Sequence, residues 1–198
     1  MALGDVVNTV IDITARMDKE AYIRATVNSI IRSIASLRDF PETLVEAPVT
    51  VSGTATAYII PLAADFRKVA YLRPSNVFAF LTEITPKRAM LNGREVVNCF
   101  YRSGNNLVVR IQVAHMTTIL AYGYYAHPAA LVGDGETNWV LDNYQDVIID
   151  LLSAKVLRVT GDESGANALE KGVALRVQEI IADSAISNGV IGASNGAG

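Results

Sequence analysis

The sequence has few cysteines and histidines, no cluster of basic residues and no long apolar run. Its one cysteine, Cys99, excludes an internal disulfide, and we expect it to be a small buried hydrophobic residue on a strand. Seventeen Lys and Arg stand against 20 Asp and Glu, which gives a net charge of −3. Because no basic cluster stands out, we do not expect this protein to bind nucleic acid tightly.

The lack of a long apolar run and the few cysteines and histidines also argue against a membrane span and a metal site. No apolar run is long enough to cross a bilayer, and the first residues lack the basic region of a signal peptide. We therefore expect a chain of cytosolic origin that makes no membrane contact. Metal sites need clustered ligands, and His115 and His127 have no cysteine or histidine at ligand spacing. We expect no metal site and no cofactor.

Proline is missing from both ends of the chain. All six prolines lie between Pro41 and Pro128, in the region that also holds most of the aromatic residues, whereas the ends are rich in Ala, Ile, Leu and Val. We predict an α+β fold in which a helical bundle, built from both chain ends, carries an inserted antiparallel β-sheet domain. The predicted parts are N-terminal helices (1–40), a β-sheet insertion (41–128), C-terminal helices (129–186) and a flexible C-terminal tail (187–198).

The N-terminal part predicts two helices. The first covers about Gly4 to Met17, and the second starts near Asp18, which is an acceptable N-cap residue. The second helix ends at Phe40-Pro41. Its apolar residues recur at spacings of three and four, which indicates one buried face: Ile23, Val27, Ile30, Ile31, Ile34 and Leu37.

The middle of the chain predicts short strands. A hairpin is expected around the turn Ser103-Gly104-Asn105-Asn106. The connections are too short for crossovers, so the pairing is predicted to be antiparallel. The expected strands are Leu44–Val51 (an edge or irregular strand, because it contains Pro48), Thr54–Ile60, Phe66–Arg73, Val77–Ile84, Val96–Arg102, Leu107–Val113 and Thr117–Tyr125.

Two more helices are expected after the strands. One covers Asp142 to Thr160 and is stopped by Gly161, and the next is capped by Asp162 or Ser164. From Ser187 the sequence SNGVIGASNGAG is flexible by composition. If a partner holds this tail, its only sizeable apolar side chains, Val190 and Ile191, are the natural anchors.

Some patterns in the sequence are similar to those of binding sites. Gly133-Asp134-Gly135 lacks the lysine of a P-loop. Asp134, Glu136 and Asn138 alternate as in a calcium loop but lack the EF-hand glycine and final glutamate, which favours a loop followed by a helix N-cap. Tyr122-Gly123-Tyr124-Tyr125 has no basic surround, which favours packing on a strand over a stacking platform for bases. With no G-x-S-x-G motif either, we predict no catalytic residue.

Asp142, Asp146 and Asp150 recur every four residues and form an acidic stripe on one predicted helix face. A solvated face opposite the core is the simplest interpretation. The alternatives are a seam between subunits or an acidic lining that repels DNA in a channel.

Several segments together resemble the adaptor, or head-to-tail connector, proteins of tailed phages, especially short-tailed ones. The resemblance depends on the order and spacing of five motifs. They are Pro61–Phe66 followed by Arg67 and Lys68, Phe100-Tyr101 before Leu107-Val108-Val109, Tyr124–Pro128 with Leu131, Glu136–Asn138 with Leu141, Tyr144 and Asp146, and Gly161-Asp162.

The resemblance implies a ring of about twelve copies, set by the symmetry of the portal protein and closed by head-to-tail contacts. Such a ring lies in the neck of the virion, is assembled in the host cytoplasm, and extends the channel through which DNA passes without specific binding. It docks a tail tube or nozzle protein below. The tail of such proteins often reaches the portal, which here implies Ser187, Asn188, Val190 and Ile191.

Two other functions stay open. A small-ligand or carbohydrate enzyme on the sheet would need convergent groups, and the sheet region offers Asp65, Glu83, Glu95 and His115 on separate elements. A tail-completion protein of the same particle would differ from an adaptor in its docking partner.

Overall fold

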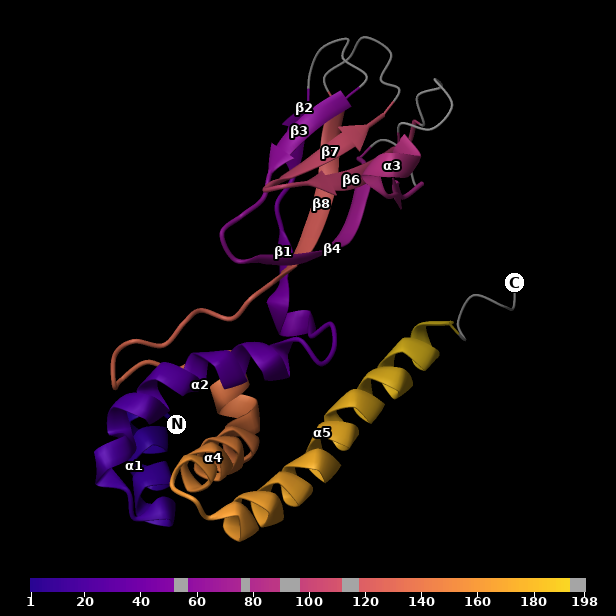
Figure 1. The fold of residues 1–198 in the computed structure, drawn as a ribbon. Helices are drawn as coiled ribbons and strands as arrows, with labels where there is room; N and C mark the ends of the chain where they lie inside the picture. The colour runs from indigo at the N-terminus through magenta and orange to yellow at the C-terminus, as the bar shows by residue number, and fades with distance from the viewer. Residues whose placement is uncertain (52–56, 76–78, 90–96, 112–117, 193–198) are drawn as a thin grey trace. The chain divides into compact units, whose positions relative to one another are not determined.

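The computed structural model describes residues 1–51, 57–75, 79–89, 97–111 and 118–192, with side chains given up to residue 182. The chain divides into two compact units (Figure 1). Residues Met1–Glu42 and Pro128–Gly198 form the helical unit, and Thr43–His127 form the β unit. Helices and largely antiparallel sheets agree with the predicted α+β class.

The helical unit contains α1 (Leu3–Thr14), α2 (Glu20–Ala35), α4 (Trp139–Val159) and α5 (Glu163–Gly192). Short 3₁₀ turns lie at Met17–Lys19 and Pro41–Thr43. Apolar residues of all four helices share one core, to which α2 contributes the predicted Ile23, Val27, Ile30, Ile31 and Ile34. Within the described residues, no helix is both long and apolar enough to cross a membrane.

The prediction that Asp18 caps the second helix is wrong. Asp18 lies in the 3₁₀ turn, where its carboxylate accepts hydrogen bonds of 2.7 and 2.8 Å from Arg16. These bonds hold the pKa of Asp18 below its ordinary range. Because Arg16 engages the carboxylate, α2 starts at Glu20 without a side-chain cap.

The loop of residues 129–138 is fastened to α1 and α2. The Asn28 side chain accepts a hydrogen bond from Leu131 N and donates one to Leu131 O, each 2.8 Å long. At the start of α1, Leu3 N donates to Glu136 O at 2.9 Å and Gly4 N donates to Asp134 O at 3.0 Å. The loop carbonyls thus satisfy two of the N–H groups that a helix start leaves unpaired.

The starts of α4 and α5 and the C-terminal end of α4 follow ordinary capping rules. The side chain of Asn138 accepts from Leu141 N at 3.0 Å, so α4 starts at Trp139, three residues before the predicted start. Gly161, with φ of +89°, follows the end of α4 as predicted. Asp162 accepts from Gly165 N at 2.9 Å and caps α5, one of the two predicted candidates.

The β unit contains two sheets. In the first, β8 (Thr118–Ala126) pairs with β1 (Leu44–Glu46), β2 (Val49–Val51) and β4 (Phe66–Pro74). In the second, β3 (Ala57–Pro61), β7 (Asn106–Arg110), β6 (Cys99–Ser103) and β5 (Thr82–Glu83) lie in that order, and α3 (Pro86–Ala89) follows β5. Buried residues of both sheets form a second core, which includes Leu72, Phe100, Leu107, Val109, Leu120 and Tyr122.

The predicted hairpin is confirmed, with β6 and β7 joined by Gly104 and Asn105, and Gly104 adopts a φ of +58°. Cys99 is buried on β6, as expected. The expectation of purely antiparallel pairing is wrong for β5, which pairs with β6 in parallel through Thr82 and Cys99. The connection of residues 84–98 is long enough for a crossover. In the described part of the predicted strand Val77–Ile84, only β5 is a strand.

Replacing Asn28 tests how strongly the loop is fastened. In Asn28→Ala the N–H and C=O of buried Leu131 lose both partners, so we expect the free energy of unfolding to fall by about 1–3 kcal/mol. Urea unfolding of the full chain measures this loss. Asn143→Ala is the control, because it removes one exposed hydrogen bond, to Trp139 O, and should cost under about 0.5 kcal/mol. Equal losses in the two variants would contradict the prediction.

A second stability test concerns Gly123 on β8. A Cβ atom there would lie 2.5 Å from Cε1 of the Tyr71 ring, whose hydroxyl donates a 2.6 Å hydrogen bond to Glu46. Gly123→Ala must therefore displace the ring, and we expect unfolding to become easier by about 1–3 kcal/mol in a urea titration. Gly135→Ala, with nothing within 4 Å of the new Cβ, should stay within about 0.5 kcal/mol of the parent. If Gly123→Ala left the free energy of unfolding unchanged, the Tyr71 ring would move at no cost and the prediction would be wrong.

Candidate assembly surfaces

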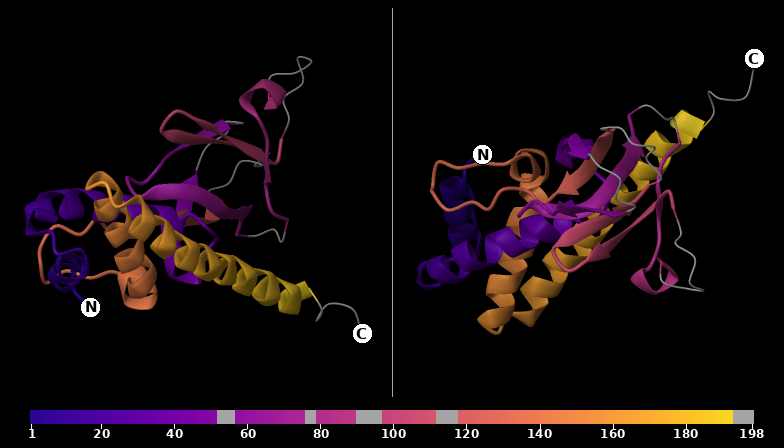
Figure 2. Two further views of the ribbon diagram at one scale, coloured as in Figure 1. Left: turned by 60° about the horizontal axis from the view of Figure 1, so that its bottom comes forward. Right: turned by 90° about the horizontal axis from the view of Figure 1, so that it is seen from above.

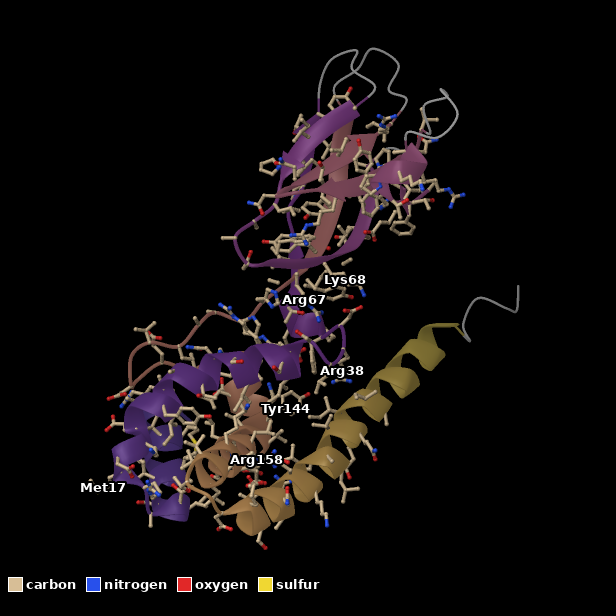
Figure 3. All side chains as sticks on the ribbon, viewed as in Figure 1. Met17, Arg38, Arg67, Lys68, Tyr144 and Arg158 are labelled. Carbon is tan, nitrogen blue, oxygen red and sulfur yellow. The ribbon has the colours of Figure 1, made fainter. Side chains whose placement is uncertain are left out.

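The three aspartates of the predicted acidic stripe lie on α4, which is not a regular helix. Tyr144 has φ of −130° and ψ of 31°, so a kink separates Asp142 from Asp146 and Asp150. Figure 3 labels Tyr144 on this helix, and its ring centroid lies 5.8 Å from that of Phe40. The spacing of four residues therefore does not place all three carboxylates on one continuous helix face.

Two of these aspartates have partners within the helical unit. Asp142 accepts a 2.6 Å hydrogen bond from the Thr137 hydroxyl. Asp150 lies 3.2 Å from the Arg176 guanidinium on α5. Asp146 is exposed and has no ion pair within the described part of the chain. A role of any of the three at a subunit seam or in a channel stays a prediction.

A hollow of about 590 Å³ lies between the kinked part of α4 and α5. Residues 142–147 line it from α4, and Arg176, Glu179 and Ile180 line it from α5. Its ionisable residues are mainly acidic, while Tyr144 and Ile180 add apolar surface. Two of the predicted acidic residues, Asp142 and Asp146, therefore line this hollow.

The predicted tail is partly helical. α5 continues to Gly192, so the backbone of Ser187, Asn188, Val190 and Ile191 is helical, where the sequence predicted a flexible tail from Ser187. The flexible composition did not exclude a helix, because this stretch has no proline and Gly189 alone costs a helix only about 1 kcal/mol. In both views of Figure 2 the C-terminal part of α5 extends beyond the other helices of the unit. The contacts of the four residues stay a prediction.

The calcium-like pattern has structural roles. Asp134 forms an ion pair with Arg24, Glu136 accepts a 2.7 Å hydrogen bond from Val132 N, and Asn138 caps α4. The preference for a loop followed by an N-cap is thus confirmed. No group of three potential metal ligands occurs among the residues that the structure describes.

Two segments of the resemblance meet at one end of the β unit. The Asp65-Phe66 segment at the start of β4 pairs with the end of β8, where His127 N donates to Asp65 O at 2.7 Å. The Tyr124 hydroxyl donates to the Asp65 carboxylate at 3.2 Å. Figure 3 shows Arg67 and Lys68 in this region, and both cations lie over the ring of Tyr125. Spacing alone did not reveal this contact between distant segments.

Tyr122 and Tyr124 pack on the strand face, as predicted. Their rings stack with centroids 5.6 Å apart, and both side chains are buried. Burial raises the pKa of Tyr122 to about 12, with a smaller effect of Tyr124 and Asp65. Both phenols are therefore neutral at ordinary pH and contribute packing to the β core.

Of the four polar residues that an enzyme on the sheet would use, the two that the structure describes, Asp65 and Glu83, lie in different places. The Asp65 carboxylate is bound to Tyr124. Glu83 lines a separate hollow of about 320 Å³ with Phe80 and Leu81. Glu95 and His115 lie outside the described residues.

Charge is divided unequally between the units, a feature that the sequence analysis missed. Thr43–His127 contain eight Lys and Arg against four Asp and Glu, whereas the helical unit contains nine against 16. The net charges are thus +4 for the β unit and −7 for the helical unit, consistent with −3 overall. The asymmetry could have been found by counting charges on each side of the predicted boundaries.

None of the curated proteins compared matches the sequence. Residues 1–188 match the sequence model of the SU10 adaptor protein family. This match covers both units and nearly the whole length of the chain, and it agrees with the resemblance to phage head-to-tail adaptors. The chain belongs to the SU10 adaptor protein family and is a phage structural adaptor protein.

Proposed function

We propose that the protein forms a ring in the neck of the virion that joins the portal to the tail and extends the DNA channel. The family match over residues 1–188 is the observation that carries this proposal. The ring consists of about twelve copies in head-to-tail contact, and the helices from both chain ends act in it as one bundle that carries the β unit.

The C-terminal part of α5 is the proposed portal contact. Along its described side chains, Ala166, Val173 and Ile180 are buried every seven residues and face α4. Leu175, on the other side, is 66% exposed, and Ile181 is 45% exposed. The face of α5 away from α4 thus exposes an apolar side chain, Leu175, which supports a contact with a partner there. In this proposal Ser187, Asn188, Val190 and Ile191 continue that helix onto the portal protein.

The other end of the ring docks a tail tube or nozzle protein, and DNA passes through without specific binding. An acidic helical unit supports this view, because carboxylates repel the phosphate backbone and leave no strong site that would hold DNA. The protein acts through its contacts and performs no reaction.

Removing the portal contact tests the proposal. The full chain mixed with the portal of the same phage should give a ring-sized addition of mass in native mass spectrometry. A chain truncated before Ser187, or carrying Val190→Asp and Ile191→Asp, should bind at least about tenfold more weakly, because the apolar anchors are lost. Ser194→Asp with Asn195→Asp adds the same charge without removing an apolar side chain and should bind as the parent does. A full chain that ignores the portal would refute the proposed function.

A further inference from the structure

Most charged groups of the helical unit are already used within that unit. Arg24 pairs with Glu20 and Asp134, and Arg158 pairs with Glu170. Two exposed carboxylates on the hollow between α4 and α5, Asp146 and Glu179, have no ion pair within the described residues. The negative charges of Asp146 and Glu179 are therefore not neutralised by a cation among the described residues of this unit.

The β unit offers the opposite charge. Lys87 and Arg88 are adjacent and exposed on α3, and neither has an ion pair within the part of the chain that the structure describes. Arg102 and Arg110, in contrast, lie over the rings of Phe66 and Tyr101. Lys87 and Arg88 are therefore two cations, among those that the structure describes in this unit, whose exposed side chains can meet an acidic surface.

We propose that Lys87 and Arg88 of one copy dock in the hollow that contains Asp146 and Glu179 of the next copy. The inference rests on the proposed ring, because a head-to-tail ring needs two different, complementary surfaces on every copy. The chain carries one on each unit, with net charges of +4 and −7. Opposite charges across a contact steer association and fix its register.

The hollow suits two long basic side chains. Its volume is about 590 Å³, and Tyr144 and Ile180 provide apolar surface for the aliphatic stems while the carboxylates meet the charged ends. A second copy fits these observations better than DNA. Two adjacent cations neutralise few phosphates compared with the roughly six to ten contacts of a typical DNA-binding protein.

Charge reversal tests the contact. Asp146→Lys with Glu179→Lys, and separately Lys87→Glu with Arg88→Glu, should each raise the concentration for half-maximal ring assembly on the portal by at least about tenfold, because like charges then face each other. An equal mixture of the two variants, or one chain with all four changes, should restore assembly. Asp12→Lys with Lys155→Glu changes exposed charges elsewhere in the helical unit and should assemble normally.

Cysteine cross-linking gives a second readout that does not need the portal. Asp146→Cys combined with Lys87→Cys should give a ladder of disulfide-linked oligomers on mild oxidation, whereas either change alone should give dimers at most. The native Cys99 adds little background, since it is buried and burial raises the pKa of its thiol. Asp12→Cys with Lys87→Cys is the control and should give no ladder.

The outcomes separate this inference from the proposed function. Normal rings from both charge-reversed variants, with no ladder, would overturn the contact and leave the ring in place. A ladder from a chain that never binds the portal would support the contact and overturn the adaptor role. If Lys87→Glu with Arg88→Glu assembles normally but no longer binds a DNA duplex, Lys87 and Arg88 bind nucleic acid and the proposed contact between copies is wrong.

Discussion

The pairing of the Asn28 side chain with the backbone of Leu131 is the interaction on which the arrangement of the helical unit depends. The two residues are 103 positions apart, and the amide provides the donor and the acceptor that a neighbouring strand would provide. Leu131 is only 4% exposed, so its backbone groups need these partners. With the loop fixed, Asn138 is positioned to cap α4, and α4 in turn sets the position of α5 and of the hollow between them.

The polar residues of the same loop have structural roles. Asp134 neutralises Arg24, and its backbone carbonyl accepts from Gly4 N at the start of α1. A Cβ atom on Gly4 would lie 3.1 Å from the Asp134 side chain, so a larger residue there would require Asp134 to shift by a few tenths of an ångström. Glu136 closes the loop on Val132. The contacts of Asp134 and Glu136 thus hold the loop against α1 and α2 and close it on itself.

The sequence predicted those features that follow from local periodicity and turn chemistry. Ile23, Val27 and Ile31 are buried on α2 because an apolar residue every three or four positions forms one face of any helix. The kink at Tyr144 could not be predicted, since the apolar residues on both sides of it keep helical spacing. The partners of Asp142 and Asp150 could not be predicted either, because they lie outside α4 and are known only from the folded structure. The net charge of −3 does not reveal the two units of opposite charge, because it adds their charges of +4 and −7 together.

Two separate hydrophobic cores allow one chain to carry two unlike surfaces. Residues such as Val27 and Ile148 stabilise the helical unit, and Leu72 and Leu120 stabilise the β unit, so the surface charge of each unit is set without cost to the core of the other. Contact between two copies of the same unit is disfavoured, because it would bring net charges of one sign together. Contact between unlike units is favoured by the same charges, and the ring that we propose would repeat that contact around its axis.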